Sequence, residues 1–220
     1  MSRRESLAKL GEMGATLAHE IRNPLAAIKG MSQSIERGIN DPEFVKDFSE
    51  VVPKEIDRLN NLVENLVRLG RTPRPQLIPV KVNEVIESVL KLFDNRCRNK
   101  GIAVSKELNP LPEIEADPEQ LTQVFTNLIL NAIQAMPNGG ELRINSRRAE
   151  DKTVIELADT GQGILEENLK TIFEPFFSTK DEGTGLGLAI TYKIIKDFGG
   201  DIEVESEVGR GTKFIIRLPV

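Results

Sequence analysis

The sequence of 220 residues contains no tryptophan, one tyrosine, one histidine and one cysteine. A single cysteine, Cys97, cannot close a disulfide within the chain and has no neighbours at metal-ligand spacing. A reducing, cytoplasmic setting is therefore expected. No apolar run approaches the roughly 18 residues that a membrane span needs, and no charged-then-apolar leader opens the chain. Any reaction that requires an imidazole must use His19.

The sequence also lacks a strong excess of positively or negatively charged residues. Lys and Arg number 29 and Asp and Glu number 34, which gives a net charge of −5 without a long basic run. This balance argues against nucleic acid as a partner. A hydrophobic content of 39% and a charged content of 29% are typical of packed domains with a soluble surface. The length allows one large domain or two small ones.

The first 70 residues carry a heptad pattern of apolar side chains that is typical of long amphipathic helices. Gly38 is expected to end the first helix, and Asp41 followed by Pro42 is expected to begin the second. Two such helices joined by a short loop predict an antiparallel hairpin. Its apolar stripe would lie in water unless a second copy covers it, so we expect a homodimer with a four-helix bundle. The two stripes consist of Leu7, Leu10, Leu17, Ile21, Ile28, Met31 and Ile35, and of Val45, Phe48, Val52, Leu59, Leu62, Leu66 and Leu69.

A proline-rich segment around residues 71–79 separates this hairpin from a different kind of pattern. We expect a helical hairpin over residues 1–72, a linker over 73–79 and a second domain over 80–220. In the second domain, mostly antiparallel strands with helices gathered on one side predict an α+β fold, a two-layer sandwich. Helices are expected over 83–100, 117–136 and 186–198, and strands over 102–108, 113–116, 141–148, 153–159, 201–206 and 212–218.

A long glycine-rich segment over residues 161–187 interrupts the second domain. It is expected to be irregular, with a short helical stretch over 166–173. Irregular segments of this length inside a compact domain are usually lids or binding loops.

His19 falls at position f of the heptad register, on the outer face of the hairpin. Asn23 lies four residues further along the same face, and Glu20 is adjacent in sequence. An exposed imidazole beside a carboxylate can act as a nucleophile whose proton the carboxylate accepts. On residue type alone, an idle surface histidine is the alternative interpretation.

Polar and glycine residues of the second domain are placed as a ligand site would need them. Asn127 and Asn131 lie four apart and share one helix face, and their amide oxygens suit Mg²⁺. Asp159 follows a strand and precedes Gly161 and Gly163, so its carboxylate could accept a hydrogen bond from an exocyclic amine while the glycines allow close approach. The alternative interpretations are that Asp159 only ends its strand at an ordinary turn, and that Asn127 and Asn131 are ordinary asparagines on a helix surface.

A second glycine-rich segment opens the helix expected over 186–198 and could cradle phosphates at its N-terminus. Lys180 lies just ahead of it and could reach a phosphate. The segment lacks the ending of a Walker A loop and does not follow a strand as a dinucleotide fingerprint does. Its residues are Gly183, Thr184, Gly185, Leu186, Gly187 and Leu188.

Six segments occur in the order found in the catalytic core of sensor histidine kinases, which the chain resembles over nearly its whole length. They resemble the phosphoacceptor box, the asparagine box, the first glycine box, the phenylalanine box, the second glycine box and the last glycine box. Gln134, Ala135 and Met136 follow the asparagines, which is similar to the nitrogen-regulation-type subgroup. The segments are residues 17–25, 127–132, 159–164, 173–177, 183–188 and 209–212.

The resemblance implies an ATP-dependent histidine autokinase that passes its phosphoryl group to an aspartate of a response-regulator receiver domain. His19 would be the phosphoacceptor, Glu20 the base that activates it, and Asn23 the residue that holds water when the regulator is dephosphorylated. Asn131 would ligate Mg²⁺, with Asn127 beside it.

The resemblance also implies where the nucleotide would bind. Asp159 would bind the adenine amine, Gly161 and Gly163 would line that pocket, and Thr212 would contribute to it. Gly183, Gly185 and Gly187 would frame the phosphates. The chain would be a cytoplasmic protein or the cytoplasmic part of a membrane-anchored sensor.

Two other functions fit the same nucleotide fold. One is an ATP hydrolase or ATP-gated clamp, in which a glutamate that activates water stands where Asn127 stands here. The other is a dimeric scaffold with a vestigial nucleotide site.

Overall fold

The computed structural model describes residues 14–70, 75–179 and 184–220. They form two compact units, a helical hairpin and a mixed α/β domain. The expected helix over residues 1–13, with Leu7 and Leu10, lies outside the described residues. The α+β fold class is confirmed.

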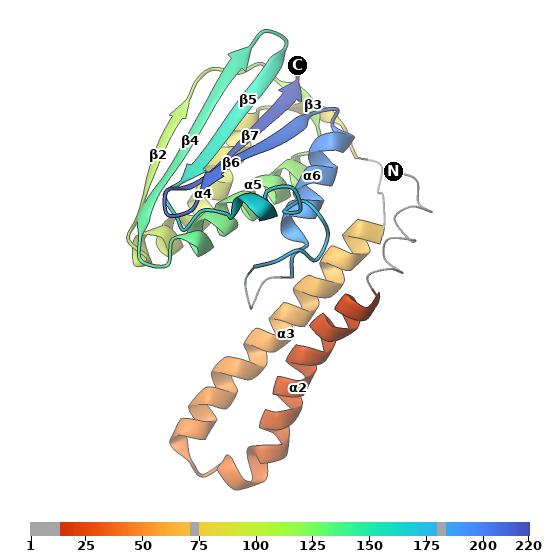
Figure 1. The fold of residues 1–220 in the computed structure, drawn as a ribbon, viewed down its shortest axis with the longest axis vertical. Helices are drawn as coiled ribbons and strands as arrows, with labels where there is room; N and C mark the ends of the chain where they lie inside the picture. The colour runs from red at the N-terminus through yellow and green to blue at the C-terminus, as the bar shows by residue number, and fades with distance from the viewer. Residues whose placement is uncertain (1–13, 71–74, 180–183) are drawn as a thin grey trace. The chain divides into compact units, whose positions relative to one another are not determined.

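The hairpin consists of α2 (Gly14–Gly38) and α3 (Pro42–Gly70), which pack antiparallel (Figure 1). The expected start of the second helix is confirmed, because the Asp41 carboxylate accepts a hydrogen bond from the backbone N–H of Glu43 at 3.0 Å. Gly38 is needed at the turn because a Cβ there would lie 2.4 Å from the ring of Phe44. The Phe44 ring thus packs against Gly38 at the turn of the hairpin.

The apolar stripes of the hairpin are only partly buried. Leu62 is 1% exposed, but Val45, which the heptad pattern places on the stripe, is 42% exposed, and Val63 is 53% exposed. The side chains of Leu66 and Leu69 lie outside the described part. One hairpin alone therefore leaves apolar surface in solvent, which costs free energy. The half-buried members of the stripes are Leu17, Ile21, Ile28, Met31, Ile35, Phe48, Val52 and Leu59.

The second unit contains a five-stranded sheet of β2 (Ile102–Leu108), β4 (Gly140–Ala149), β5 (Lys152–Asp159), β6 (Asp201–Glu207) and β7 (Gly211–Pro219). The strand order is β2-β4-β5-β7-β6. All neighbours pair antiparallel except β2 and β4, which are parallel. The predicted strands are therefore present, and the expectation of a mostly antiparallel sheet is confirmed.

Three helices cover one face of this sheet (Figure 1). They are α4 (Val82–Asn99), α5 (Pro118–Ala135) and α6 (Gly187–Asp197), close to the predicted ranges. Asp117 caps α5 by accepting hydrogen bonds from the backbone N–H groups of Glu119 and Gln120. The layer between helices and sheet holds the core, in which Phe125 and Ile155 are almost fully buried.

Two short strands form a second, separate sheet. β1 (Ile78–Val80) pairs antiparallel with β3 (Ile114–Ala116). β1 includes the end of the segment expected to be linker, and the Asp117 carboxylate also accepts a hydrogen bond from the Gln76 backbone N–H at 3.1 Å. The polypeptide is thus attached to the second unit before residue 80.

The glycine-rich segment contains less helix than the sequence predicts. Instead of a helical stretch over 166–173, one 3-10 turn, η1 (Glu166–Asn168), is followed by turns. Among the described helices, none combines the length and the apolar character that a bilayer crossing requires. Cys97 is buried in α4, and this burial raises the pKa of its thiol.

Thr153 on β5 supplies a test of the core. Its side chain is fully buried and its hydroxyl has no hydrogen-bond partner. We expect Thr153→Val to raise the free energy of unfolding by about 1 kcal/mol, because an unpaired polar group is removed without changing side-chain shape. Thermal unfolding measures the change. Thr122→Val is the control, since the Thr122 hydroxyl donates to the Pro118 carbonyl at 2.7 Å; equal stabilisation of both variants would contradict the prediction.

Candidate functional site

One face of α5 carries Asn127, Asn131 and Ala135, each four residues from the next. The Asn127 amide nitrogen donates to the Gly187 carbonyl at 3.0 Å and to the Thr191 hydroxyl at 3.3 Å. At the other end, the Ala135 carbonyl accepts a hydrogen bond from the Gln162 backbone N–H at 3.1 Å. Eight residues of helix span about 12 Å. This face therefore connects the start of α6 to the loop that follows β5.

Asp159, at the end of β5, is 9% exposed. Its Oδ1 atom accepts a hydrogen bond from the Gly161 backbone N–H at 2.8 Å. A Cβ at Gly161 would lie 2.6 Å from the Ala135 carbonyl oxygen, so only glycine lets this loop pass so close to α5. Asp159 pairs with Thr212 of β7 and lies at the same level of the sheet. The predicted adenine-contacting residues are thus brought together.

The first and last glycine-rich segments contact each other through their backbones. Gly163 has a φ of +71°, and a Cβ there would lie 2.2 Å from the Glu207 carbonyl oxygen. The Gly209 N–H donates to the Gln162 carbonyl at 2.8 Å. The loop after β5 is therefore held against the turn between β6 and β7.

Gly185 precedes α6 with a φ of +61°, and a Cβ there would lie 2.4 Å from the backbone of Phe176. The Phe176 N–H donates to the Gly185 carbonyl at 3.0 Å. Leu186 is fully buried, so its side chain packs in the core, and Leu188 and Thr184 are half-buried.

Gly187, at the start of α6, is not crowded. A Cβ there would lie 3.6 Å from the Asn127 side chain, which is ordinary contact. Lys180 and Gly183 lie outside the described residues.

The candidate phosphoacceptor lies on α2 of the hairpin. His19 and Asn23 are exposed, as the heptad register predicts. Glu20 is partly buried, and its Oε2 atom lies 3.5 Å from Nη2 of Arg58 on α3. The Glu20 and Arg58 side chains are 24% and 20% exposed. The carboxylate beside the histidine is therefore tethered to the neighbouring helix, while the imidazole faces solvent.

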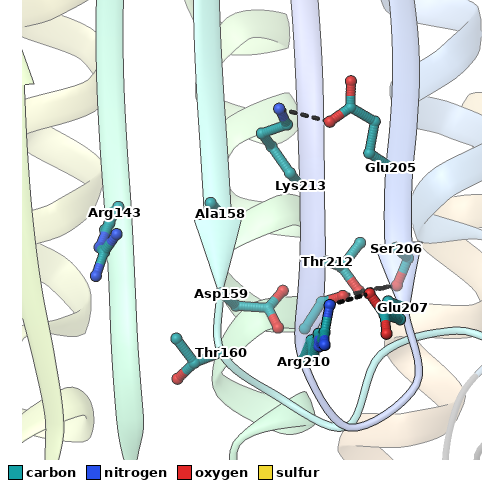
Figure 2. A pocket seen from close by; sticks show the side chains of 11 residues that line it. Arg143, Ala158, Asp159, Thr160, Glu205, Ser206, Glu207, Arg210, Thr212 and Lys213 are labelled. Atoms are coloured by element: carbon teal, nitrogen blue, oxygen red, sulfur yellow. Dashed lines mark hydrogen bonds and ion pairs between the residues drawn. The ribbon is translucent and has the colours of Figure 1, made fainter.

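A shallow pocket of about 460 Å³ opens at the ends of the strands (Figure 2). It includes Asp159 and Thr212 but neither candidate asparagine. Its other residues come largely from the face that the helices leave uncovered, where Lys213 pairs with Glu205. The hydrogen bond that Lys213 donates to the Glu205 carboxylate raises the pKa of Lys213. The charged groups here neutralise one another. The lining is completed by Arg143, Ala158, Thr160, Ser206, Glu207, Arg210 and Gly211.

Three polar residues that the sequence analysis did not single out contact the candidate site residues. Arg58 pairs with Glu20, Thr191 accepts from Asn127, and Ser206 contacts Thr212. Ser206 could have been found from the expected hairpin register. No local signal marks the other two, since each contact joins two elements distant in sequence.

Comparison with known families gives two matches. Residues 9–74 match the family "His Kinase A (phospho-acceptor) domain". Residues 116–220 match the family "Histidine kinase-, DNA gyrase B-, and HSP90-like ATPase". The two matches occupy the hairpin and most of the mixed domain, respectively.

Individual relatives agree with these matches. The sensor histidine kinase ZraS of Escherichia coli K12 is 40% identical over 221 residues, which covers 100% of this chain and 48% of that protein. Sporulation kinase C of Bacillus subtilis is 36% identical, covering 98% of this chain and 50% of that protein. The chain thus spans about half the length of these relatives.

Two solved structures are similar as well. The histidine kinase ThkA, in complex with the response regulator TrrA, is 34% identical with a TM-score of 0.87, covering 99% of this chain and 64% of that one. The isolated catalytic domain of ThkA is 36% identical with a TM-score of 0.60, covering 65% of this chain and 95% of that one. With a phospho-acceptor hairpin followed by an ATPase-like domain, the chain belongs to the sensor histidine kinases.

Proposed function

We propose that the chain is an ATP-dependent autokinase that phosphorylates His19 and donates the phosphoryl group to an aspartate of a response-regulator receiver domain. The observation that carries this proposal is the position of the only histidine in the sequence. It is exposed on a helix that matches the phospho-acceptor family, and the same chain carries a domain that matches the ATPase family. Acceptor and nucleotide-binding domain are therefore present in one molecule.

The proposed reaction forms a bond between an imidazole nitrogen of His19 and the γ-phosphorus of ATP, and breaks the bond from that phosphorus to the β–γ bridging oxygen. ADP leaves with the electron pair of the broken bond. Glu20 accepts the imidazole proton, a role that its position next to the histidine supports, and the ion pair with Arg58 holds its side chain in place. Phosphoryl transfer needs mainly positioning and charge neutralisation from the protein.

The proposed nucleotide site uses the face of α5 described above. Asp159 and Thr212 recognise the base, with Gly161 and Gly163 giving it room. The phosphates lie toward the start of α6, where the backbone at Gly185, Leu186, Gly187 and Leu188 and the positive end of the helix dipole attract negative charge. Thr184, Gly183 and Lys180 complete this set.

Asn131 is the proposed ligand of Mg²⁺. It is half-buried on α5, and a side-chain amide oxygen is a ligand type that this ion accepts beside water and phosphate oxygens. Bound there, Mg²⁺ would neutralise charge on the phosphates. Asn127 holds the neighbouring turn of α5 against α6.

The residue type and the hydrogen bonds of Asn127 both argue against an ATP hydrolase or clamp. A water-activating residue at this position must accept a proton, and a neutral amide cannot. The amide nitrogen also donates to Gly187 and Thr191, so Asn127 serves as a structural connection.

The proposed assembly is a homodimer in which two hairpins form a four-helix bundle. The apolar side chains that one hairpin leaves exposed support it. The proposed partner is a receiver domain, because the similar kinase ThkA forms a complex with a response regulator. We also propose that Asn23, exposed one turn from His19, holds water when the chain dephosphorylates that regulator. Since ATP is the phosphoryl donor, the reaction takes place in the cytoplasm.

Incubation of the purified chain with γ-labelled ATP and Mg²⁺ tests the proposed function. The protein should become labelled, and the label should be lost in acid but retained in alkali, as a phosphoramidate is. Addition of a receiver domain should then move the label to that domain. Rapid release of inorganic phosphate without a labelled protein would contradict the proposal and would favour the hydrolase.

A further inference from the structure

Three polar side chains form one row across three adjacent strands at the candidate base-binding end of the sheet. Asp159 of β5 pairs directly with Thr212 of β7, which pairs directly with Ser206 of β6. Directly paired residues on antiparallel strands point to the same face. Figure 2 shows the three close together near the ends of these strands. Ser206 is therefore next to a predicted base-contacting residue, although the sequence analysis gave it no role.

The hydroxyl of Ser206 has three neighbours. It accepts a hydrogen bond from the Ile164 backbone N–H at 2.9 Å, and it lies 2.8 Å from the Gly211 carbonyl oxygen and 2.9 Å from the Thr212 hydroxyl oxygen. A carbonyl oxygen can only accept, and a serine hydroxyl carries a single proton. The Ser206 proton must therefore point to Gly211, or two oxygens without a proton between them would face each other.

This assignment fixes the direction of the contact with Thr212. Because the proton of Ser206 is used on Gly211, the hydroxyl proton of Thr212 must be donated to Ser206. Ser206 then donates once and accepts twice, which fills its hydrogen-bonding capacity. Thr212 is 6% exposed, and its oxygen has only lone pairs left for a further partner. Thr212 is thereby made an acceptor.

We propose that Ser206 is a positioning residue that sets base specificity by holding the Thr212 hydroxyl as an acceptor. The inference rests on the proposed function and assigns its selectivity for the base. The Asp159 carboxylate can also only accept when ionised, so neighbouring strands present acceptors at one level. A purine with an exocyclic amine on this edge can donate hydrogen bonds to these acceptors. A purine with a carbonyl at that position would instead place its oxygen against the acceptor oxygens. Sites with fixed hydrogen-bonding groups discriminate strongly in this way.

Calorimetric binding of ADP and of inosine diphosphate (IDP), whose base carries a carbonyl in place of the amine, tests the proposal. The native chain should prefer ADP. In Ser206→Ala the Thr212 hydroxyl loses its acceptor and its proton is free to turn toward a ligand carbonyl. We expect the ratio of ADP affinity to IDP affinity to fall about tenfold, the size of one neutral hydrogen bond. Equal weakening of both nucleotides would overturn the proposal, because it would indicate a structural role for Ser206.

A second set of variants distinguishes action through Thr212 from a change in folding. Thr212→Val should lower the same ratio, and adding Ser206→Ala to it should change the ratio no further. Ser206→Thr keeps a hydroxyl and should retain the native preference, and Ser88→Ala removes an exposed hydroxyl on α4 as the control. Independent, additive effects, or an unchanged ratio in Thr212→Val, would overturn the inference even if Ser206→Ala fails to fold.

The outcomes separate this inference from the proposed function. If the native chain binds ADP and becomes labelled on His19 while the variants keep the native ratio, only the role of Ser206 is wrong. If the native chain binds neither nucleotide, the proposed nucleotide site and this inference are both wrong.

Discussion

Replacing His19 by glutamine is expected to reduce labelling of the chain by γ-labelled ATP to background. The sequence contains no second histidine that could accept the phosphoryl group. Glutamine keeps polarity and similar length, but its amide nitrogen is not a nucleophile of comparable strength. Autoradiography of the denatured protein, with the labelled band quantified over time, measures the loss. Few substitutions should have so complete an effect with so little change in folding, because the side chain is exposed.

Nucleotide binding and thermal unfolding of His19→Gln should remain native, since the proposed base-contacting residues Asp159 and Thr212 lie in the other unit. Lys29→Gln, an exposed substitution on the same helix, is the matched control and should label normally. Substantial acid-labile labelling of His19→Gln would show that another residue is the acceptor, and the proposed function would then fail at its central residue.

Gly211→Ala is expected to lower the free energy of unfolding of the mixed domain by about 3 kcal/mol or more. Gly211 has a φ of +113°, which L-residues rarely adopt, and a Cβ would lie 1.9 Å from the Asp159 carbonyl oxygen. Backbone strain of this kind costs about 1–3 kcal/mol by itself, and overlap with the neighbouring strand adds to it. At roughly 2–4 °C per kcal/mol, the melting temperature should fall by about 10 °C. ADP binding should also be lost, because β5 and β7 must separate beside Asp159 and Thr212.

Gly209→Ala separates the two contributions. Gly209 lies in the same turn with a φ of +79°, but a Cβ there meets nothing within 4 Å. Gly209→Ala should therefore lower the free energy of unfolding only by the cost of the left-handed backbone conformation, about 1–2 kcal/mol. The two variants are compared by calorimetric unfolding. If Gly209→Ala destabilises the domain as much as Gly211→Ala does, the close approach to Asp159 is not the cause.

Those features of the fold that have a local cause could be predicted from the sequence. Asp117 before Pro118 and Asp41 before Pro42 mark helix starts because a short side-chain acceptor caps the free N–H groups. The exposure of His19 follows from its position in the heptad. The six expected strands lie within one or two residues of β2 to β7, whereas β1 begins in the segment expected to be linker.

Features that depend on contacts between distant segments could not be predicted in the same way. The parallel pairing of β2 with β4 and the pairing of β1 with β3 are decided by tertiary packing. Arg58 lies 38 residues from Glu20, and nothing in either local sequence indicates the pair. The direction of the hydrogen bond between Ser206 and Thr212 depends on the positions of Gly211 and Ile164 as well as on the register.

The face of α5 that carries Asn127, Asn131 and Ala135 has a consequence for how this family can vary. Asn127 is tied to the start of α6 and Ala135 to the loop after β5, with Asn131 between them. One inserted or deleted residue between them would turn one end of the face by about 100° relative to the other. Substitutions on the outer side of this helix are therefore tolerable, whereas a change in its length is not. The helix thus acts as a spacer between two contacts, for which the number of its residues matters as much as their identity.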